Sequence, residues 1–388
     1  MKTATKFLAV VVFAVLALPH HVLAQHYTET VLVANTSVPN QSPVLDSNLL
    51  NPWGLVASPG SPWWDSNNAG GTSTLYDATG LTLSPPSVPP VSIVPINGNG
   101  IVTIPSAPSQ NGAAGSPTGI MFNGNSAIFH LPNGNSASFI YVTEDGTVQG
   151  WADGASATIV ADNSVKPSAA EGAVYKGATI AEIGGKEYIL AANFRSGRVD
   201  VFDSTFKQVR LRGEAFGGEA EDEDSANEGF APFNIQGIGP NIYISYAKQD
   251  AAKHDPVGGA GLGFVDVFSN AGRRLQRLQH GMWFNAPWGI ALAPSNFGEF
   301  SHTILVGNFR GGTIAAFNPL TGRFMGNVLN PDGSELKIDG LWALEFGNGS
   351  GAGPAQTLFF TAGPNNEKDG LFGTLTPIDD ELNGADEQ

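Results

Sequence analysis

The 388-residue sequence contains no cysteine and few charged side chains. Without cysteine no disulfide can form, so a stable fold must rely on a buried core and on paired strands. Charged residues make up 14% of the chain, and 35 acidic side chains outnumber 19 basic ones, giving a formal net charge of −16. This negative charge argues against nucleic acid and anionic membranes as partners, because both would repel it.

Beyond the N-terminal leader, the sequence also lacks a stretch whose apolar residues recur at the spacing of an amphipathic helix. The leader carries Lys2 and Lys6, then an apolar run over residues 7–18, and ends at the small residue Ala24. This order indicates a secretory signal peptide over residues 1–24, with an N-terminal membrane anchor as the alternative. Because no later stretch is long and apolar enough to span a bilayer, we expect no membrane span after signal cleavage. We therefore expect a secreted protein, periplasmic or extracellular.

Glycine and proline, by contrast, are abundant, at 49 and 26 residues. Such a composition is typical of a chain with many short strands and many turns. No shift in composition divides residues 25–378, which we expect to form a single domain, followed by an acidic tail over residues 379–388. The chain is too long for one sandwich, so a closed ring of sheets fits it better.

One hairpin pattern recurs along the chain at intervals of roughly 50–60 residues. Its clearest copy, residues 303–318, is an apolar strand, a turn containing Asn308-Phe309-Arg310 and Gly311-Gly312, and a second apolar strand. Residues 188–203 repeat this plan, including Asn193-Phe194-Arg195. Further copies are residues 139–151 and residues 242–268, the latter interrupted by a long insert. Repetition at this interval indicates a propeller or a solenoid.

Each repeat begins with a strand led by proline or glycine, and there are six such leaders: Pro52, Pro117, Gly177, Pro232, Pro287 and Gly340. Small residues are expected where strands converge on a propeller axis. The sixth repeat lacks a fourth strand, whereas residues 29–34 form a strand without a repeat of its own. Pairing the strand of residues 29–34 with the sixth repeat would close the ring and remove two sheet edges. We predict an all-β fold, a six-bladed β-propeller of four-stranded blades in which the N-terminal strand closes the last blade.

In such a blade, the start of the first strand and the turn between the second and third strands share one rim, where loops can carry function. The ligand-binding candidates on this rim are Trp53, Asp65, Glu144, Asn193, Arg195, Tyr246, Lys248, Asp250, His254, Asp255, Asn308, Arg310 and Asn365. Structural alternatives exist for several of them. Asparagine suits turns, Arg195 and Arg310 could tie blades together, and Trp53 and Trp288 could pack blades. The insert carrying Lys248 to Asp255 could be a solvated turn.

Rings of oxygen ligands around a propeller axis can hold Ca²⁺. The candidate ligands are Asp65, Glu144, Asn193, Asn308 and Asn365, although no linear calcium motif is present. Nucleophilic catalysis has little support, because the chain lacks a Gly-x-Ser-x-Gly elbow as well as cysteine. Of the histidines, His254 alone has charged neighbours on the expected rim, and a histidine near aspartate can act as a general base.

Several stretches resemble a known family. They include Asn51-Pro52-Trp53-Gly54, Ala191-Ala192-Asn193-Phe194-Arg195, Tyr246-Ala247-Lys248-Gln249-Asp250, Lys253-His254-Asp255 and Ile338-Asp339-Gly340-Leu341-Trp342. The sequence resembles a bacterial family of exported NHL-like propellers, some of which carry a C-terminal Pro-Glu-Pro sorting tail. The resemblance implies a secreted bacterial propeller and assigns no catalytic residue. This chain ends in Asn383-Gly384-Ala385-Asp386-Glu387-Gln388 without that tail, which favours a soluble form over an anchored one.

These observations lead to two functional hypotheses. The first is a secreted binding or scaffold protein, expected to be monomeric, that holds a small molecule, glycan or protein partner on the rim. The second is a Ca²⁺-dependent hydrolase of the gluconolactonase or paraoxonase type, an analogy that rests on the fold alone.

Overall fold

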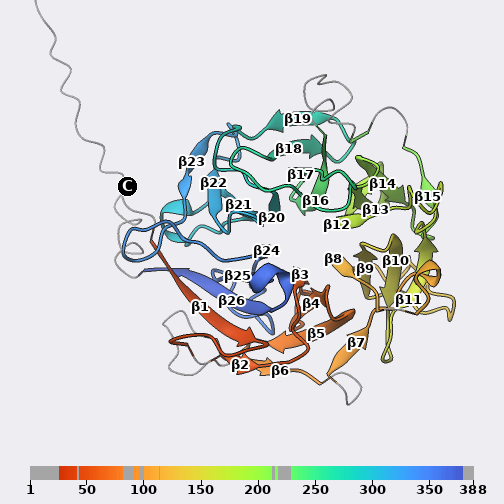
Figure 1. The fold of residues 1–388 in the computed structure, drawn as a ribbon, viewed down its shortest axis with the longest axis horizontal. Helices are drawn as coiled ribbons and strands as arrows, with labels where there is room; N and C mark the ends of the chain where they lie inside the picture. Colours follow the sequence, from red (N-terminus) through yellow and green to blue (C-terminus); the bar gives the residue numbers. More distant parts are fainter. Residues whose placement is uncertain are drawn as a thin grey trace, which may run out of the picture.

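Six antiparallel sheets stand in a ring around a central axis (Figure 1). The computed structural model describes residues 26–41, 43–81, 91–95, 100–112, 114–211, 215–216 and 229–378. The fold is a six-bladed β-propeller, which confirms the prediction from the repeats. The expected signal peptide, residues 1–24, and the acidic tail, residues 379–388, lie outside the described residues.

Each blade is a meander whose first strand is nearest the axis (Figure 1). Blade 1 comprises β3 (Pro52–Val56), β4 (Trp63–Asn67), β5 (Thr72–Asp77) and β6 (Ser92–Ile93), with β7 (Ile101–Thr103) also pairing with β5. Blade 2 comprises β8 (Pro117–Phe122), β9 (Phe139–Thr143), β10 (Thr147–Trp151) and β11 (Thr158–Asp162). Blade 3 comprises β12 (Tyr175–Ile183), β13 (Lys186–Asn193), β14 (Arg198–Phe202) and β15 (Gln208–Val209).

The second half of the chain repeats this arrangement. Blade 4 comprises β16 (Phe230–Ile238), β17 (Asn241–Lys248), β18 (Phe264–Ser269) and β19 (Arg274–Arg277). Blade 5 comprises β20 (Pro287–Leu292), β21 (Ile304–Asn308), β22 (Ile314–Phe317) and β23 (Phe324–Asn327). Blade 6 comprises β24 (Leu341–Phe346), β25 (Leu358–Ala362), β26 (Leu371–Pro377), β1 (Tyr27–Ala34) and β2 (Val44–Leu45).

The N-terminal strand closes the ring, as the sequence predicts. β1 pairs antiparallel with β26, so that Thr30 lies opposite Thr374 and Tyr27 opposite Pro377. β2 adds a short parallel pairing on the outer side of β1, which the sequence pattern does not indicate. The closure joins the two ends of the described chain within one sheet and covers the edge of β26.

Glycines in the inner strands allow neighbouring blades to approach closely at the axis. A Cβ atom added at Gly54 of β3 would lie 2.5 Å from the carbonyl oxygen of Thr118 in β8. One added at Gly119 would lie 2.7 Å from the backbone nitrogen of Ala178 in β12. Since real Cβ contacts do not occur at such distances, these positions accept only glycine without backbone movement.

The sequence predicts no helix after the leader, and the described residues hold three short helical turns. These are η1 (Pro108–Gln110), η2 (Gly298–Phe300) and α2 (Pro364–Glu367). Inside α2, Asn365 and Asn366 have φ values of 56° and 53°. They are left-handed residues in a tight turn, a conformation that asparagine tolerates better than most residues. Among the described residues, no helix has the length and hydrophobicity to cross a bilayer.

Candidate functional site

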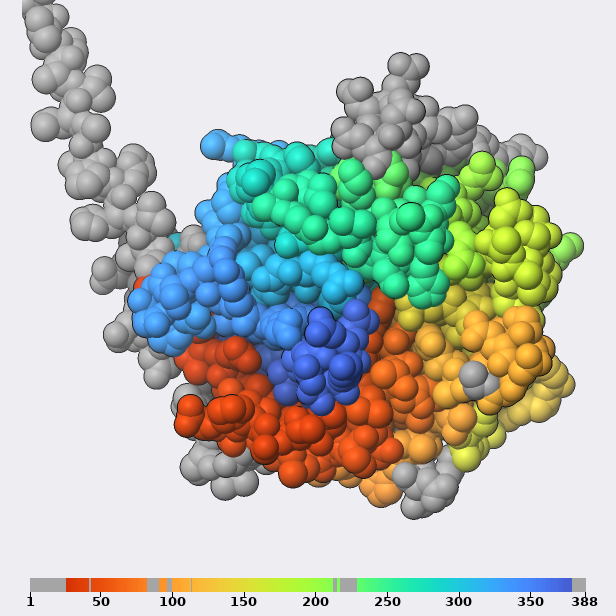
Figure 2. Space-filling model, viewed as in Figure 1, coloured from red at the N-terminus to blue at the C-terminus, as the bar shows by residue number. Residues whose placement is uncertain are grey.

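Each blade brings polar side chains to one end of the pore, which we call the rim mouth. It is formed by the starts of the inner strands and by the turns between the second and third strands of each blade. Strand register places these two features together: Pro52 lies opposite Asn67 in blade 1, and Pro287 opposite Asn308 in blade 5. Figure 2 views this face, with the dark-blue turn of the last blade near its centre.

Aromatic rings fill the pore beneath the rim mouth. Trp53 stacks on Trp342 with ring centroids 3.5 Å apart, and Phe309 stacks on the same ring at 3.8 Å. Trp288 meets Trp53 edge-on at 6.2 Å, and Phe233 lies 6.4 Å from Trp53. All of these side chains are buried. We call this cluster the aromatic plug; it gives the mouth an apolar floor whose ring faces attract positive charge.

Lys176 is the charged centre of the rim mouth. It lies at the start of β12, its side chain is fully buried, and its ammonium group pairs with Glu144 of blade 2 and, at 3.2 Å, with Asp255 of blade 4. The ammonium nitrogen also lies 5.2 Å from the ring centroid of Trp53 and 5.8 Å from that of Phe194. Two carboxylates and two aromatic faces thus stabilise a charge that burial alone would disfavour.

His254 and Asp255 form the solvent-facing part of the same cluster. They belong to the insert between β17 and β18, and their side chains are 37% and 57% exposed. The Nδ1 atom of His254 lies 3.0 Å from an Asp255 carboxylate oxygen. This hydrogen bond and the nearby charge of Lys176 lower the pKa of Asp255. Asp250 shapes the turn by accepting a hydrogen bond from the His254 backbone N–H at 2.8 Å.

The remaining blades complete the rim mouth. Asn68 of blade 1 donates to Glu144 at 2.8 Å, and Asn51 donates to Glu367 of blade 6 at 3.1 Å. Burial and the negative charge of Glu144 raise the pKa of Glu367, which the charge of Arg310 from blade 5 opposes. Every blade therefore brings at least one polar side chain to this end of the pore.

Several left-handed backbone conformations lie beside this cluster, and others lie elsewhere, such as those of Phe129 and Phe206. Asn51 has a φ of 47°, and three consecutive residues, Asn365, Asn366 and Glu367, have φ values of 56°, 53° and 66°. Such conformations cost energy for residues other than glycine and are held in place by their surroundings. The charged cluster, rather than these conformations alone, makes the rim mouth the candidate site.

Of the residues predicted for the rim, the structure brings Glu144, His254 and Asp255 together around Lys176. Trp53 lies directly beneath them in the aromatic plug, 2% exposed. Arg310 stands over the ring of Phe309, with its guanidinium carbon 4.5 Å from the ring centroid.

Other predicted residues lie in separate structural settings. Asp65 is fully buried and accepts hydrogen bonds from Asn67 and from the backbone and hydroxyl of Thr74. Asn193 accepts from the Ser196 backbone at 3.2 Å, and Asn308 accepts from the Asn285 backbone at 2.9 Å. These contacts set the local turns.

The rest of the predicted rim residues are also placed by local contacts. Arg195 donates to the carbonyl of Gly172, in the segment that leads into β12, at 3.0 Å. Tyr246 is 1% exposed and stacks on Phe264 at 4.6 Å. Lys248 lies opposite Phe230 at the end of β17. Asn365 donates to Asp369 at 3.1 Å.

The rim mouth contains one group of potential metal ligands. Glu144, His254 and Asp255 each offer an atom within 4.8 Å of the others. Calcium prefers six to eight oxygen ligands, whereas this set offers three groups, one of them a ring nitrogen. The ammonium of Lys176 already pairs with both carboxylates. The residues present therefore do not fit a calcium site.

Sequence reasoning missed Lys176, Glu367, Asn51 and Asn68. Lys176 carried a signal, because it is a charged residue at the start of an otherwise apolar inner strand in a chain with few charges. The others could not be found from chain position alone, since their side chains meet through contacts between blades.

No protein-family model matches the sequence. The chain is 30% identical to uncharacterized protein R648 of Acanthamoeba polyphaga mimivirus over 354 residues, covering 89% of this chain and 78% of that protein. It is also 30% identical to uncharacterized protein L690 of the same virus over 345 residues, covering 85% and 81%. The chain belongs to the family of these mimivirus proteins. These relatives are viral, whereas the sequence motifs resemble exported bacterial proteins.

Solved structures share only the general fold. A protein of unknown function from Bacteroides thetaiotaomicron aligns with a TM-score of 0.47 at 11% identity, covering 90% of this chain and 76% of that one. A gluconolactonase from Xanthomonas campestris aligns with a TM-score of 0.40 at 13% identity, covering 90% and 98%. Likenesses this distant do not bear on the chemistry of the rim mouth.

Proposed function

We propose that this propeller is a binding protein that holds a small, hydroxyl-rich molecule such as a saccharide or a sugar lactone at the rim mouth. The observation that carries the proposal is the buried ion-pair cluster beneath an exposed His254–Asp255 pair. Burying a charged lysine is costly, and ion pairs of this kind contribute little net stability compared with apolar packing. A charge held there by three blades therefore supports a role in recognition.

The composition of the mouth supports the ligand class. Carboxylates of Glu144, Asp255 and Glu367 offer acceptors, Arg310 offers donors, and the buried Lys176 compensates the charges of Glu144 and Asp255. Because the opposite charges lie side by side, the mouth has no large excess of one sign that would select a strongly charged ligand. Hydroxyl groups both donate and accept, so they match such a mixed surface.

A panel of monosaccharides, disaccharides and sugar lactones tests the proposal on the protein without its leader. We expect at least one compound to bind, and His254→Ala to weaken that binding at least tenfold, since His254 is exposed at the mouth. His130→Ala is the matched control, because His130 is an exposed histidine in the β8–β9 connection at the other end of the blade. Calorimetry would measure both variants. Equal affinity in wild type and His254→Ala, or no binding by any compound, would refute the proposal.

The calcium-dependent hydrolase is the second hypothesis, and it is disfavoured because Glu144, His254 and Asp255 lie together but do not fit a calcium site. Calcium that bound the folded protein would raise its melting temperature. Because Lys176 already neutralises two of the three groups, we expect the melting temperature to be the same with EDTA and with added calcium. A rise on adding calcium, together with lactone hydrolysis, would instead support the hydrolase.

We further propose that the protein is bacterial, exported and monomeric. Support comes from the order of charged, apolar and small residues over residues 1–24 and from the motif resemblance. N-terminal sequencing of the protein released by an expressing bacterium should begin at Gln25. Light scattering should give the mass of one chain.

A further inference from the structure

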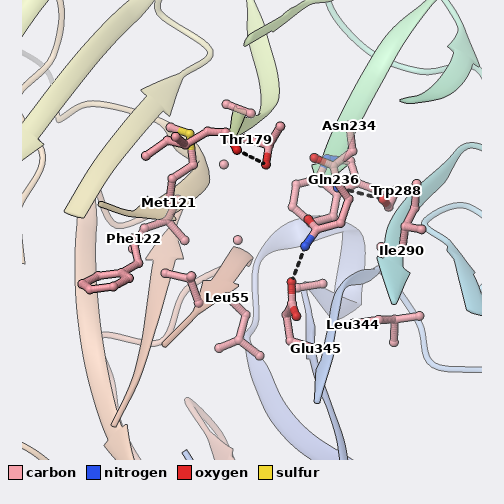
Figure 3. Close-up of a pocket in the computed structure, with 18 residues that line it drawn as sticks. Leu55, Met121, Phe122, Thr179, Asn234, Gln236, Trp288, Ile290, Leu344 and Glu345 are labelled. Carbon is pink, nitrogen blue, oxygen red and sulfur yellow. Dashed lines mark hydrogen bonds between the residues drawn. The ribbon is translucent and has the colours of Figure 1, made fainter. Parts of the chain in front are cut away.

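A cavity of about 190 Å³ lies among the six inner strands (Figure 3). Its lining residues follow Trp53 along β3 and Trp342 along β24, which places the aromatic plug between the cavity and the rim mouth. All six inner strands line the cavity. Along each strand, the lining residues come after the residues that form the mouth. Trp288 belongs to both the plug and the cavity wall. At the far ends of these strands Phe122, Ile180 and Glu345 are partly exposed, which places the opening of the cavity at the end of the pore away from the mouth.

Apolar side chains such as Leu55, Met121 and Leu344 line the cavity, and polar atoms make up the larger part of its accessible surface. Among its 18 lining residues, Glu345 of β24 is the one titratable side chain. The side-chain amide of Gln236 in β16 donates to Glu345 Oε1 at 2.8 Å (Figure 3). Within the described part of the chain, Glu345 Oε2 has no hydrogen-bond partner. One carboxyl oxygen is thus held in place while the other is left for a ligand.

Burial raises the pKa of Glu345 to about 8, and the hydrogen bond from Gln236 only partly opposes this shift. The group is therefore largely a neutral acid at pH 7, and its O–H can donate a hydrogen bond. Carboxylic acids kept neutral in apolar sites donate in this way in other proteins.

We propose that the axial cavity binds a small, uncharged ring compound bearing one carbonyl group, with the six inner strands enclosing the ring and Glu345 donating to the carbonyl oxygen. The size agrees with this class, because an apolar cavity of about 150 Å³ accommodates benzene. The site is separate from the rim mouth, since the aromatic plug lies between them.

Methionine labelling gives a direct test. The sequence has four methionines, of which Met1 is in the leader. Met121 lines the cavity, whereas Met282 and Met325 are 72% and 44% exposed. Cyclohexanone is the probe, with cyclohexane as the equivalent ring without an acceptor and cyclohexylammonium as the cationic equivalent. In ¹³C-methyl spectra at pH 6, cyclohexanone should shift the Met121 signal and leave those of Met282 and Met325 in place.

Two substitutions then test the role of Glu345. Glu345→Leu should weaken cyclohexanone binding at least tenfold, whereas Glu345→Gln keeps a donor and should bind nearly as wild type does. Because binding requires the acid form, raising the pH from 6 to 9 should weaken binding to wild type about tenfold and leave Glu345→Gln unaffected. Cyclohexane should bind more weakly than cyclohexanone in wild type.

Three results would overturn the inference. The first is an unshifted Met121 signal at saturating cyclohexanone. The second is equal affinity for cyclohexanone in wild type and Glu345→Leu. The third is tighter binding of cyclohexylammonium than of cyclohexanone, which would show a charged carboxylate that accepts cations. His254→Ala serves as a control outside the cavity and should leave the Met121 shift unchanged.

Discussion

Lys176 shows how much a single side chain can organise in this protein. It is fully buried, yet it pairs with carboxylates from two other blades and faces two aromatic rings. Removing its charge would leave Glu144, itself only 12% exposed, beside Asp255 without compensation. Two carboxylates close together in a partly buried site repel each other strongly.

Lys176→Met should therefore destabilise the fold by about 3–5 kcal/mol, the usual effect of breaking a buried ion pair from one side. Urea denaturation measures the change. Lys337→Met is the matched control: Lys337 is 65% exposed and pairs with Glu335 at 3.4 Å, so its loss should cost less than about 1 kcal/mol. Equal effects of the two substitutions would contradict the account of the rim mouth.

Asp65 predicts a dependence of stability on pH. Burial raises its pKa from 3.8 to about 7 in the folded protein, against hydrogen bonds from Thr74 and Asn67. Between these two pKa values the folded state binds more protons than the unfolded state. The contribution of Asp65 to stability is therefore complete below about pH 4 and is lost as pH rises through 7. Asp65→Asn removes this titration while keeping an oxygen acceptor for Thr74. The loss of stability between pH 4 and 8 should shrink by roughly 3 kcal/mol in the variant.

Chemical denaturation at both pH values checks this expectation. Asp153→Asn, at an exposed position, serves as the control and should follow the wild-type profile. A profile that is the same for Asp65→Asn and wild type would show that Asp65 is charged in the fold.

At this scale the sequence predicted part of the site. Glu144, His254 and Asp255 were found because charged residues are rare in the chain and these fall in rim turns. Asp65 lies within β4 and Asn193 at the end of β13, and their side chains satisfy neighbouring backbone and hydroxyl groups. Chain position identifies the rim and does not fix the direction of a side chain, which depends on which partner lies within hydrogen-bonding distance.

At the scale of elements, the inner strands depend on the absence of a Cβ atom. Gly54→Ala would bring a methyl group to 2.5 Å from the Thr118 carbonyl oxygen, and β3 and β8 would have to separate. We expect a loss of roughly 2–3 kcal/mol from overpacking. Gly60→Ala is the control, because an added Cβ there has no atom within 4 Å; it should be neutral or stabilising by less than about 1 kcal/mol. Thermal melts of both variants would show the difference, and equal melting temperatures would contradict it.

The elements themselves were largely predictable. Alternating apolar residues and glycine turns locate the second and third strands well, as in residues 303–318, where β21 and β22 lie. The outer strands are harder, because β6 and β15 each span only two residues and carry little pattern. α2 could not be predicted, since its left-handed asparagines follow from contacts such as that between Asn365 and Asp339.

At the scale of the whole molecule, closure of the ring is the feature that holds the chain together. Deleting residues 26–34 removes β1 and exposes the edge of β26 to other chains. We expect the melting temperature to fall by about 10 °C or more and the protein to self-associate. Deleting residues 379–388, which follow the last described strand, is the control and should change neither property. A shortened chain that stays monomeric with an unchanged melting temperature would contradict this role for β1.

The ring was predictable because six leaders and an unpaired N-terminal strand can be counted in the sequence. The aromatic plug and the axial cavity were not, since they form only when six inner strands from distant parts of the chain meet. Trp53 and Trp342, for example, are far apart in sequence and stack at 3.5 Å.

The central claim is that the six blades together build a ligand site at the rim mouth. The most direct measurement is a crystal structure of residues 25–388 soaked with the tightest binder found among the saccharides and sugar lactones. The account predicts density for the compound within hydrogen-bonding distance of His254 and Asp255. A mouth that stays empty at a saturating concentration, or density for the compound only on another surface, would contradict it.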